Sequence, residues 1–214
     1  MTTPTMDSGS RVPHYLLVGY VLLFAVCGWQ PHDRATWWAE NIPVVLIVAA
    51  LGSTYRRFRF TDTSYLLMSV FVYLHTVGGH FTFERVPFET VTEIFGFQRN
   101  HYDRVAHFSV GFYGYALAEI LYRRRLVNAT WVLVCFPTAF IYTVAAIYEI
   151  IEWRYAVLEG GASGAAFLGS QGDVWDAQKD MLADGLGAMV TVLWFAWRHR
   201  ATLPAAPPSD SPSA

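Results

Sequence analysis

The sequence has little charge and few cysteines for its length. Only 15% of its 214 residues are Asp, Glu, Lys or Arg, whereas 54% are hydrophobic and 16% are aromatic. Soluble globular domains carry nearer a quarter charged residues, so this composition indicates a membrane protein. The net charge of −2 provides no basic face, which argues against nucleic acid as a partner. Two cysteines, Cys27 and Cys135, cannot form a disulfide framework and are interpreted as small apolar fillers.

Three kinds of sequence signal are also missing. The N-terminal segment lacks the charged start and small-residue cleavage site of a signal peptide, so its apolar run is predicted to stay as a helix. No internal repeat is evident, which does not favour an inverted-repeat transporter. The sequence has no His-Glu-x-x-His motif and no two histidines four positions apart, so a standard zinc-protease signature is absent.

Six apolar runs are long enough to cross hydrocarbon as helices of about 17–25 residues. The runs cover residues 14–30, 37–55, 63–80, 105–122, 131–153 and 178–197. The first, second and fifth are interpreted as plain spans, and the other three as spans with ionisable residues. The predicted fold class is therefore all-α: a polytopic membrane bundle of about six transmembrane helices over residues 14–198. Residues 1–13 are predicted to be a polar cytoplasmic segment, and the Pro/Ser/Ala-rich residues 199–214 a disordered tail.

Arginine and lysine in the short connections predict the orientation of this bundle, because cytoplasmic loops carry the excess of positive charge. One side has nine of these residues, namely Arg11, Arg56, Arg57, Arg59, Arg123, Arg124, Arg125, Arg198 and Arg200. The other side has six, mixed with acids, namely Arg34, Arg85, Arg99, Arg104, Arg154 and Lys179. Both termini are predicted to be cytoplasmic. The connections 81–104 and 154–177 then lie on the outer face, where the Gly-rich second one suits a tight loop.

Acidic and imidazole side chains gather at the outer ends of four predicted helices. The third, fourth, fifth and sixth helices contribute, in turn, His75 and His80, Asp103 and His107, Glu149 and Glu152, and Asp173, Asp176, Asp180 and Asp184. The last three aspartates recur at every fourth position, so a helix places them along one stripe. Ionised carboxylates this close together and this deep in a membrane need a counter-charge.

Two kinds of counter-charge fit this cluster. Protein cations are one, with Arg85, Arg99, Arg104, Arg154 and Lys179 as candidates. A divalent metal is the other, either Zn, Mn or Fe, or Mg if only oxygens bind it. The metal-ligand candidates are His75, His80, Asp103, His107, Asp176 and Asp180. The catalytic candidates are Glu149 and Glu152, as proton carriers, and Asp184, the deepest carboxylate.

Single residues differ in how strongly they point to function. His107 is the best candidate, because Asp103 lies one helical turn before it and can orient its imidazole. A hydrogen bond from His107 to a neighbouring helix explains it equally well. His75 lies on an aromatic face, where a structural bridge is the more common role. Glu119 has Arg123 four residues further on, and a plain ion pair accounts for it.

Three stretches of the sequence read NHYDRVAHFSVGFYGYALAE, YEIIEW and GSQGDVWDAQKDMLADGLGA. They resemble the YjdF-like family of bacterial inner-membrane proteins, a domain of unknown function, and the resemblance covers about residues 15–198. The Asp-Arg pair followed by His one turn later is also similar, over this one helix, to VanZ-type membrane proteins. The resemblance implies a multi-spanning protein of the bacterial inner membrane and brings no activity with it. The residues that match the family's motifs are Asp103, Arg104, His107, Glu149, Glu152, Gln171, Asp173, Asp176, Asp180 and Asp184.

Three functions remain open from the sequence. The preferred one is a metal-assisted hydrolase or transferase acting on a lipid-like substrate, with membrane lipids or a polar head group as its ligand. The second is a proton- or cation-coupled transporter, although only Glu119 continues the acidic series beyond Asp184. The third is a structural or assembly protein in which an ion-paired network joins the outer helix ends.

Overall fold

A computed structural model describes residues 9–168 and 170–203 of the chain. These residues fold into α-helices and contain no strand, which confirms the all-α fold class. The helices are α1 (Val12–Cys27), α2 (Arg34–Thr54), α3 (Asp62–Phe81), α4 (Glu89–Phe95), α5 (Tyr102–Val110), α6 (Tyr113–Arg123), α7 (Thr130–Glu159), α8 (Gly161–Leu168) and α9 (Asp176–His199). Most of the two polar tails, at 1–8 and 204–214, lies outside the described residues, so their predicted character stays a prediction.

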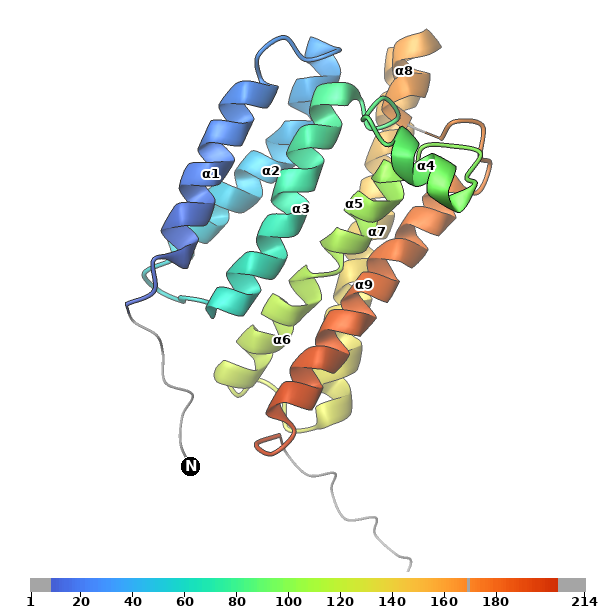
Figure 1. Cartoon of the computed structure of the whole chain (residues 1–214). Coiled ribbons are helices and arrows are strands. Elements are labelled where there is room, and N and C mark those ends of the chain that lie inside the picture. The colour runs from blue at the N-terminus through green and yellow to red at the C-terminus, as the bar shows by residue number, and fades with distance from the viewer. Residues whose placement is uncertain (1–8, 169, 204–214) are drawn as a thin grey trace, which may run out of the picture.

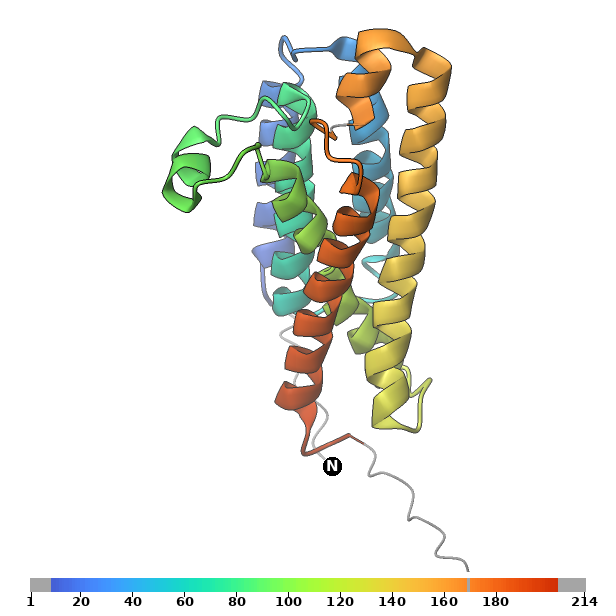
Figure 2. The ribbon, with the colours of Figure 1, turned by 90° about the vertical axis from the view of Figure 1, so that its right-hand side faces the viewer.

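The long helices stand side by side, and neighbours in the chain run in opposite directions (Figures 1 and 2). Both ends of the described chain leave the bundle at one end, the lower end in Figure 1. The opposite, upper end carries α4 and α8. α3 packs against α1, α2, α5 and α6, whereas α9 packs against α5, α6 and α7. The bundle therefore consists of two groups of helices that meet along α3, α5 and α6.

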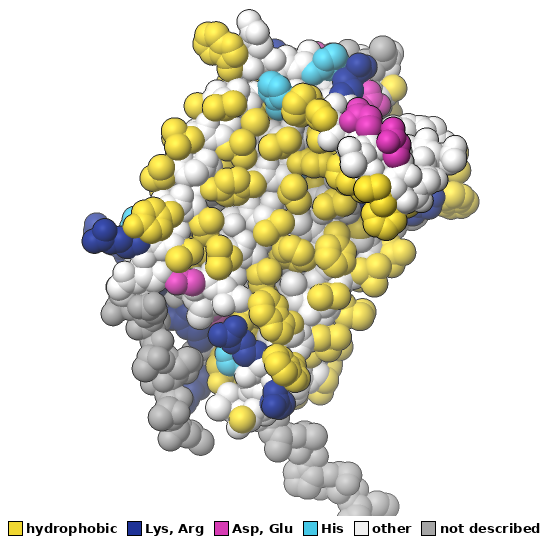
Figure 3. All heavy atoms as spheres, viewed as in Figure 1, with side chains coloured by type: hydrophobic (Ala, Val, Ile, Leu, Met, Phe, Trp, Pro, Cys, Tyr) yellow, Lys and Arg dark blue, Asp and Glu magenta, His cyan; other side chains and the backbone are white. Residues whose placement is uncertain are grey.

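Apolar side chains cover much of the outside of the bundle. Leu46 of α2 is 63% exposed and Ile150 of α7 is 57% exposed, and large apolar residues of α1 and α9 are exposed as well. Hydrophobic side chains cover most of the face in Figure 3, and charged side chains gather toward its two ends. Among the described helices, α2 and α7 are long and apolar enough to cross a membrane, and α1 is a shorter apolar helix. This surface suits hydrocarbon rather than water.

The fourth apolar run is not the single helix predicted for residues 105–122, because it breaks into α5 and α6 at Gly111. The break lies where this segment touches α9. A Cβ atom added to Gly111 would lie 2.2 Å from the backbone nitrogen of Ala188, and one added to Gly187 would lie 1.9 Å from the carbonyl oxygen of Phe108. The hydroxyl of Thr191 donates to the carbonyl of Gly111 at 3.1 Å. Two backbones thus meet without side chains between them, as small residues allow in membrane bundles.

The Gly-rich stretch after the fifth apolar run is more ordered than the predicted loop. α7 continues to Glu159, and the chain reverses at Gly160 and Gly161, whose φ angles are +68° and +54°. Residues without a Cβ adopt such left-handed conformations at little cost. α8 then folds back against α7, with the Cα of Gly164 so near that an added Cβ would lie 2.4 Å from the carbonyl oxygen of Ala156. The prediction of a loop at this position is corrected to a turn followed by a helix.

Hydrogen bonds hold the connections at the lower end. Arg123 Nη1 lies 2.5 Å from Glu119 Oε1, which confirms the predicted ion pair. The same guanidinium nitrogen donates to the carbonyl of Arg59 at 2.6 Å, and Arg59 in turn donates to the carbonyl of Ser10. Glu119 also accepts a hydrogen bond from the backbone N–H of Thr61 at 3.0 Å. The buried carboxylate therefore joins α6 to the start of α3 in addition to pairing with its own helix.

Candidate functional site

The turns before α5 and α9 are tied together, and this positions the ionisable residues of both helices. The backbone N–H of Asn100 donates to Gln171 Oε1 at 3.0 Å, and Gln171 Nε2 donates back to the carbonyl of Asn100 at 3.0 Å. Lower down, the glycine contact between Gly111 and Gly187 holds the same two helices close together. The i, i+4 spacing along each helix then turns the aspartates of α9 and the Asp103–His107 pair of α5 toward one another.

His107 lies at the centre of three carboxylates. Its Nδ1 atom is 3.1 Å from Asp184 Oδ2, and its Nε2 atom is 3.7 Å from Asp103 Oδ1 and 4.0 Å from Asp180 Oδ1. One ligand atom each from Asp103, His107 and Asp180 can be chosen so that all three lie within 4.8 Å of one another. Asp184 is only 1% exposed. One imidazole nitrogen thus faces two carboxylates, while a third carboxylate holds the other nitrogen.

Arginines neutralise the upper part of the aspartate stripe. Arg99 Nη1 and Arg104 Nη2 each lie 2.6 Å from Asp176 Oδ1. Arg104 Nη1 lies 2.6 Å from Asp180 Oδ1, but the geometry is not that of a hydrogen bond. Asp176, predicted as a metal ligand, is instead the partner of two guanidinium groups, because the turn before α5 brings both arginines over the start of α9. The ion-paired network of Asp176 with Arg99 and Arg104 and the cluster around His107 therefore lie next to each other along α9.

Of the three other cations predicted as partners of the acidic cluster, Lys179 contacts an aspartate, whereas Arg85 and Arg154 lie elsewhere. Lys179 Nζ donates to Asp173 Oδ2 at 2.6 Å. Arg85 lies against Glu84 and Arg154 lies over the ring of Trp153, so neither faces the aspartates of α9.

Two ionisable groups at the upper ends of α5 and α9 lie outside the apolar runs and have shifted pKa values. The hydrogen bond from Lys179 lowers the pKa of Asp173, and the backbone N–H of Trp175 acts in the same direction. Burial lowers the pKa of His101, and the positive charges of nearby Arg99 and Arg104 lower it further. Around neutral pH the carboxylate of Asp173 is therefore ionised and the imidazole of His101 is neutral.

Three buried carboxylate oxygens near His107 have no hydrogen-bond partner among the described residues, namely Asp180 Oδ1, Asp184 Oδ1 and Glu149 Oε1. Asp180 Oδ1 still has Arg104 as an ion-pair partner at 2.6 Å. Buried polar atoms are rarely left without a partner, because each such atom costs about 1–3 kcal/mol. Asp184 lines an internal cavity, so a ligand in that cavity can supply the missing interaction. This observation is independent of the spacing of the aspartates and points to a ligand.

A second polar group faces the same cavity from α2, α3 and α7. His75 Nε2 lies 3.1 Å from Glu40 Oε2, and the hydroxyl of Tyr148 donates to the same oxygen at 3.0 Å. Glu40 is not among the site residues predicted from the sequence, because the apolar run 37–55 is typical of a plain span, although a glutamate within such a run is itself a signal of function. His75 does not join the predicted ligand set around His107, because the ligand atoms that lie within 4.8 Å of one another come from Asp103, His107 and Asp180.

His80 lies apart from all of these groups. Its Nδ1 atom is 2.6 Å from the carbonyl oxygen of Cys27, a contact between α3 and α1. Five positions on a helix correspond to a rotation of about 140°, so His75 and His80 cannot face the same cavity. The expectation that His80 is a metal ligand is corrected on this geometry.

The cavity has a volume of about 280 Å³ and lies between the two groups of helices. Ionisable residues line its upper part, namely Glu40, His75, Asp103, His107, Glu152 and Asp184. Its lower part is lined by apolar residues, which include Ile47, Val110, Leu117, Phe140 and Val144. Leu168 of α8 also lines the cavity. Of the two glutamates predicted to carry protons, Glu152 lines this cavity, and Glu149 is buried one turn lower on α7.

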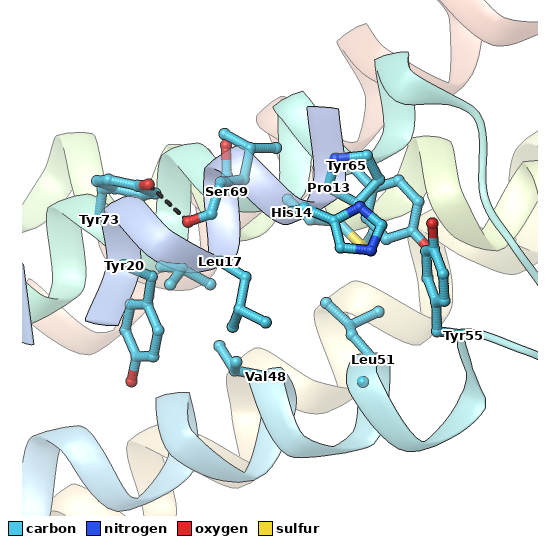
Figure 4. Close-up of a pocket in the computed structure, with 14 residues that line it drawn as sticks. Pro13, His14, Leu17, Tyr20, Val48, Leu51, Tyr55, Tyr65, Ser69 and Tyr73 are labelled. Atoms are coloured by element: carbon cyan, nitrogen blue, oxygen red, sulfur yellow. Dashed lines mark hydrogen bonds between the residues drawn. The ribbon is translucent and has the colours of Figure 1, made fainter. Parts of the chain in front are cut away.

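A separate cavity of about 220 Å³ lies nearer the lower end, between α1, α2 and α3. Figure 4 shows its mainly apolar and aromatic lining, with the hydroxyl of Tyr73 donating to the carbonyl of Leu16 at 2.8 Å. His14 is the one histidine among the described residues that line this cavity, and none of these lining residues is a carboxylate. The chemistry of the upper end is therefore confined to the first cavity.

Helical architecture, apolar surface and buried charge together define a membrane protein. Residues 12–201 match the family described as predicted membrane protein (DUF2238), and the chain belongs to this family. It is similar to the inner membrane protein YjdF of Escherichia coli (strain K12), with 38% identity over 181 residues, which cover 83% of this chain and 86% of that protein. No solved structure matches the chain. The predicted resemblance to the YjdF-like family is thus confirmed.

Proposed function

We propose that this chain is a six-span protein of the bacterial inner membrane whose outer end binds a divalent metal. The metal serves the hydrolysis of a lipid-like substrate, or the transfer of a group from it. The single observation that carries the proposal is the placement of Asp103, His107 and Asp180, whose ligand atoms lie within 4.8 Å of one another at the end of a cavity.

The donor set fits a catalytic metal. Two carboxylates and one imidazole, without cysteine, suit Zn, Mn or Fe, and three protein ligands leave positions open for water and substrate. Asp184 holds the Nδ1 atom of His107 at 3.1 Å, so the Nε2 atom is free to bind the metal. Carboxylates that orient a metal-bound histidine in this way are a general feature of such sites. Asp184 is accordingly assigned to positioning, and Glu152 and Glu149 are the groups offered as proton carriers.

The shape of the cavity supports a lipid-like substrate. Its polar end is the end with the metal site, and its apolar part extends as far as Phe140, twelve residues or about 18 Å along α7 from Glu152. Phe140 and Val144 line the cavity and are also 45% and 40% exposed on the outside of the bundle. A hydrocarbon chain can therefore enter sideways between helices while the head group lies among the carboxylates.

The orientation proposed from the sequence agrees with the arrangement of the helices. The two ends of the described chain lie at the lower end, where Arg59 and Arg123 take part in the hydrogen bonds of the connections. If six segments cross the bilayer, with α5 and α6 forming one of them, both termini lie on the same side, and the excess of arginine favours the cytoplasm for that side. The metal site then lies beneath the outer surface.

A structural role is the second candidate, favoured by the Arg99–Asp176–Arg104 network. That network explains Asp176 but not the Asp184 Oδ1 atom, which lies two turns deeper and has no hydrogen-bond partner in the described part of the chain. Transport is less well supported, because the cavity is apolar below Asp184 and the next carboxylate, Glu119, is bound by Thr61 and Arg123 at the lower end.

Elemental analysis of the detergent-purified protein tests the proposal. We expect about one equivalent of Zn, Mn or Fe per chain, and a lower melting temperature after treatment with a chelator. His107→Ala and Asp103→Asn should lose the metal. His80→Ala is the matched control, since the imidazole of His80 is hydrogen-bonded to the carbonyl of Cys27, away from the proposed ligands, and this variant should retain the metal. If the wild-type protein holds no metal and chelator leaves its melting temperature unchanged, the proposed function is wrong.

A further inference from the structure

Glu40, His75 and Tyr148 form a second group on the cavity, and the metal site does not use it. They come from α2, α3 and α7 and line the same cavity as Asp103 and His107. Glu40 is 2% exposed and His75 is 6% exposed. A carboxylate this deeply buried in an apolar helix is costly and marks a functional position in membrane proteins.

The hydrogen bonds fix where the proton of His75 lies. Its Nε2 atom is 3.1 Å from Glu40 Oε2 and also 3.1 Å from the carbonyl oxygen of Glu40. Both neighbours are acceptors when the carboxylate is ionised, so Nε2 carries the proton and Nδ1 holds a lone pair. Nδ1 has no hydrogen-bond partner among the described residues. Glu40 is itself fixed by the hydroxyl of Tyr148, which donates to it at 3.0 Å.

We propose that His75 is the general base of the reaction, with Glu40 as its orienting carboxylate. The inference rests on the proposed function, because the base acts on a water or substrate hydroxyl that attacks in the cavity. As the new bond to oxygen forms, the O–H proton moves to His75 Nδ1, and Glu40 stabilises the resulting imidazolium. The same proton is then delivered to the leaving oxygen as its bond breaks, which returns His75 to the neutral state.

The lining of the cavity fits direct attack by water or by a hydroxyl group of a second substrate. Among its described residues there is no Ser, Thr, Cys or Lys, so an activated aliphatic hydroxyl, thiol or amine of the protein is not at hand, and the hydroxyl of Tyr148 is engaged by Glu40. A base placed across the cavity from the metal ligands therefore serves the attacking oxygen rather than a protein nucleophile. In this scheme Glu152 has a secondary role and assists proton movement toward the outer surface.

A reactive amphiphile tests whether Nδ1 is accessible and nucleophilic. The purified protein is treated with N-decyl bromoacetamide, and alkylated residues are identified by mass spectrometry. We expect His75 to be alkylated, and more slowly by bromoacetamide, which has no tail to enter the apolar part. Glu40→Gln should slow the reaction at His75 by about tenfold or more, because the orienting carboxylate is lost. The matched control Glu93→Gln changes an exposed carboxylate of α4 and should react like the wild type.

Two further measurements keep the test decisive. Tyr148→Phe retains the aromatic ring, removes the hydroxyl, and should slow alkylation less than Glu40→Gln does. The nitrogen NMR shifts of His75 should report a proton on Nε2. An unreactive His75, or a proton found on Nδ1, overturns the assignment of the base. The metal content of each sample is measured in parallel. Full metal with an unreactive His75 rejects only the base, whereas absent metal rejects the proposed function.

Discussion

The Nδ1 atom of His107 and the Oδ2 atom of Asp184 lie 3.1 Å apart, and they join α5 to α9. The contact fixes the imidazole so that its Nε2 atom faces Asp103 and Asp180. Without a partner, a carboxylate that is 1% exposed would be strongly unfavourable in this position. The pair therefore explains both the depth of Asp184 and the direction in which His107 points.

Asp184→Asn is predicted to weaken metal binding without removing a metal ligand. An amide can still fill the space, but it holds the imidazole less firmly and adds no basicity to Nε2. The affinity of metal-stripped protein for Zn²⁺ or Mn²⁺ should fall about 10–100-fold, as measured by isothermal titration calorimetry. Asp173→Asn is the control, because Asp173 pairs with Lys179 at 2.6 Å and with Arg99 at 3.6 Å and does not contact His107. Equal affinities for Asp184→Asn and the wild type would remove Asp184 from the site.

Arg104→Ala is predicted to destabilise the upper end of the bundle. Arg104 lies 2.6 Å from both Asp176 and Asp180, so its removal leaves a partly buried negative charge with fewer partners. Breaking such a pair costs about 3–5 kcal/mol when the partners are buried, and less here because Arg104 is 17% exposed. Unfolding in detergent with increasing denaturant measures the effect.

Arg154→Ala is the matched control for Arg104, because Arg154 lies over Trp153 and away from the aspartates. Its effect should stay below about 1 kcal/mol. The double variant Arg104→Ala with Asp176→Asn should recover part of the lost stability, since the uncompensated carboxylate is then neutral. A fully additive double variant would contradict the ion-pair explanation.

The sequence predicts the elements of this site that depend on spacing along one helix. The aspartate stripe of α9 and the Asp103–His107 pair follow from the 3.6-residue period and lie where it places them. Glu119 and Arg123 are paired for the same reason. Within each of these two pairs, Asp103–His107 and Glu119–Arg123, the residues are one turn apart, so that local geometry alone decides the contact.

Contacts between distant segments escape this kind of prediction. Glu40 and Tyr148 are 108 positions apart, and only the tertiary fold, in which α2 and α7 line the same cavity, brings them together. The spacing of Asp176 in the sequence is that of a metal ligand. Arg99, in the turn before α5, instead holds the Asp176 carboxylate in an ion pair. The break at Gly111 likewise depends on the backbone of α9 and not on any helix-breaking proline. Tertiary contacts decide the role of such residues, and one sequence does not show them.

Gly187→Ala is predicted to separate α5 from α9. An added Cβ would lie 1.9 Å from the carbonyl oxygen of Phe108, and backbone at that distance can only move away. The cluster around His107 depends on this contact, so metal content and melting temperature should both fall. Gly52→Ala is the control, because a Cβ at that helical position meets nothing within 4 Å. It should be neutral or stabilising by up to about 1 kcal/mol. Normal metal content in Gly187→Ala would show that the close approach is dispensable.

The ion pair of Asp173 with Lys179 is predicted to make stability depend on acid pH. The hydrogen bond from Lys179 lowers the pKa of Asp173 in the folded protein. The folded state therefore binds this proton less readily than the unfolded chain, in which the pKa is about 3.9. The stabilisation is complete above that value and is lost as the pH falls through the lower pKa of the folded protein.

Melting temperatures of the wild type and of Asp173→Asn, measured from pH 7 to pH 3, test this dependence. The wild type should be the more stable at pH 7, and the difference should shrink below about pH 4, where the carboxylate begins to take up its proton. Lys179→Gln should reproduce part of the effect of Asp173→Asn at neutral pH, because it removes the other partner of this hydrogen bond and leaves Arg99 and the Trp175 backbone N–H in place. A difference that stays constant over the whole range would mean that Asp173 stabilises the turn through its hydrogen bond to the Trp175 backbone and not through its charge.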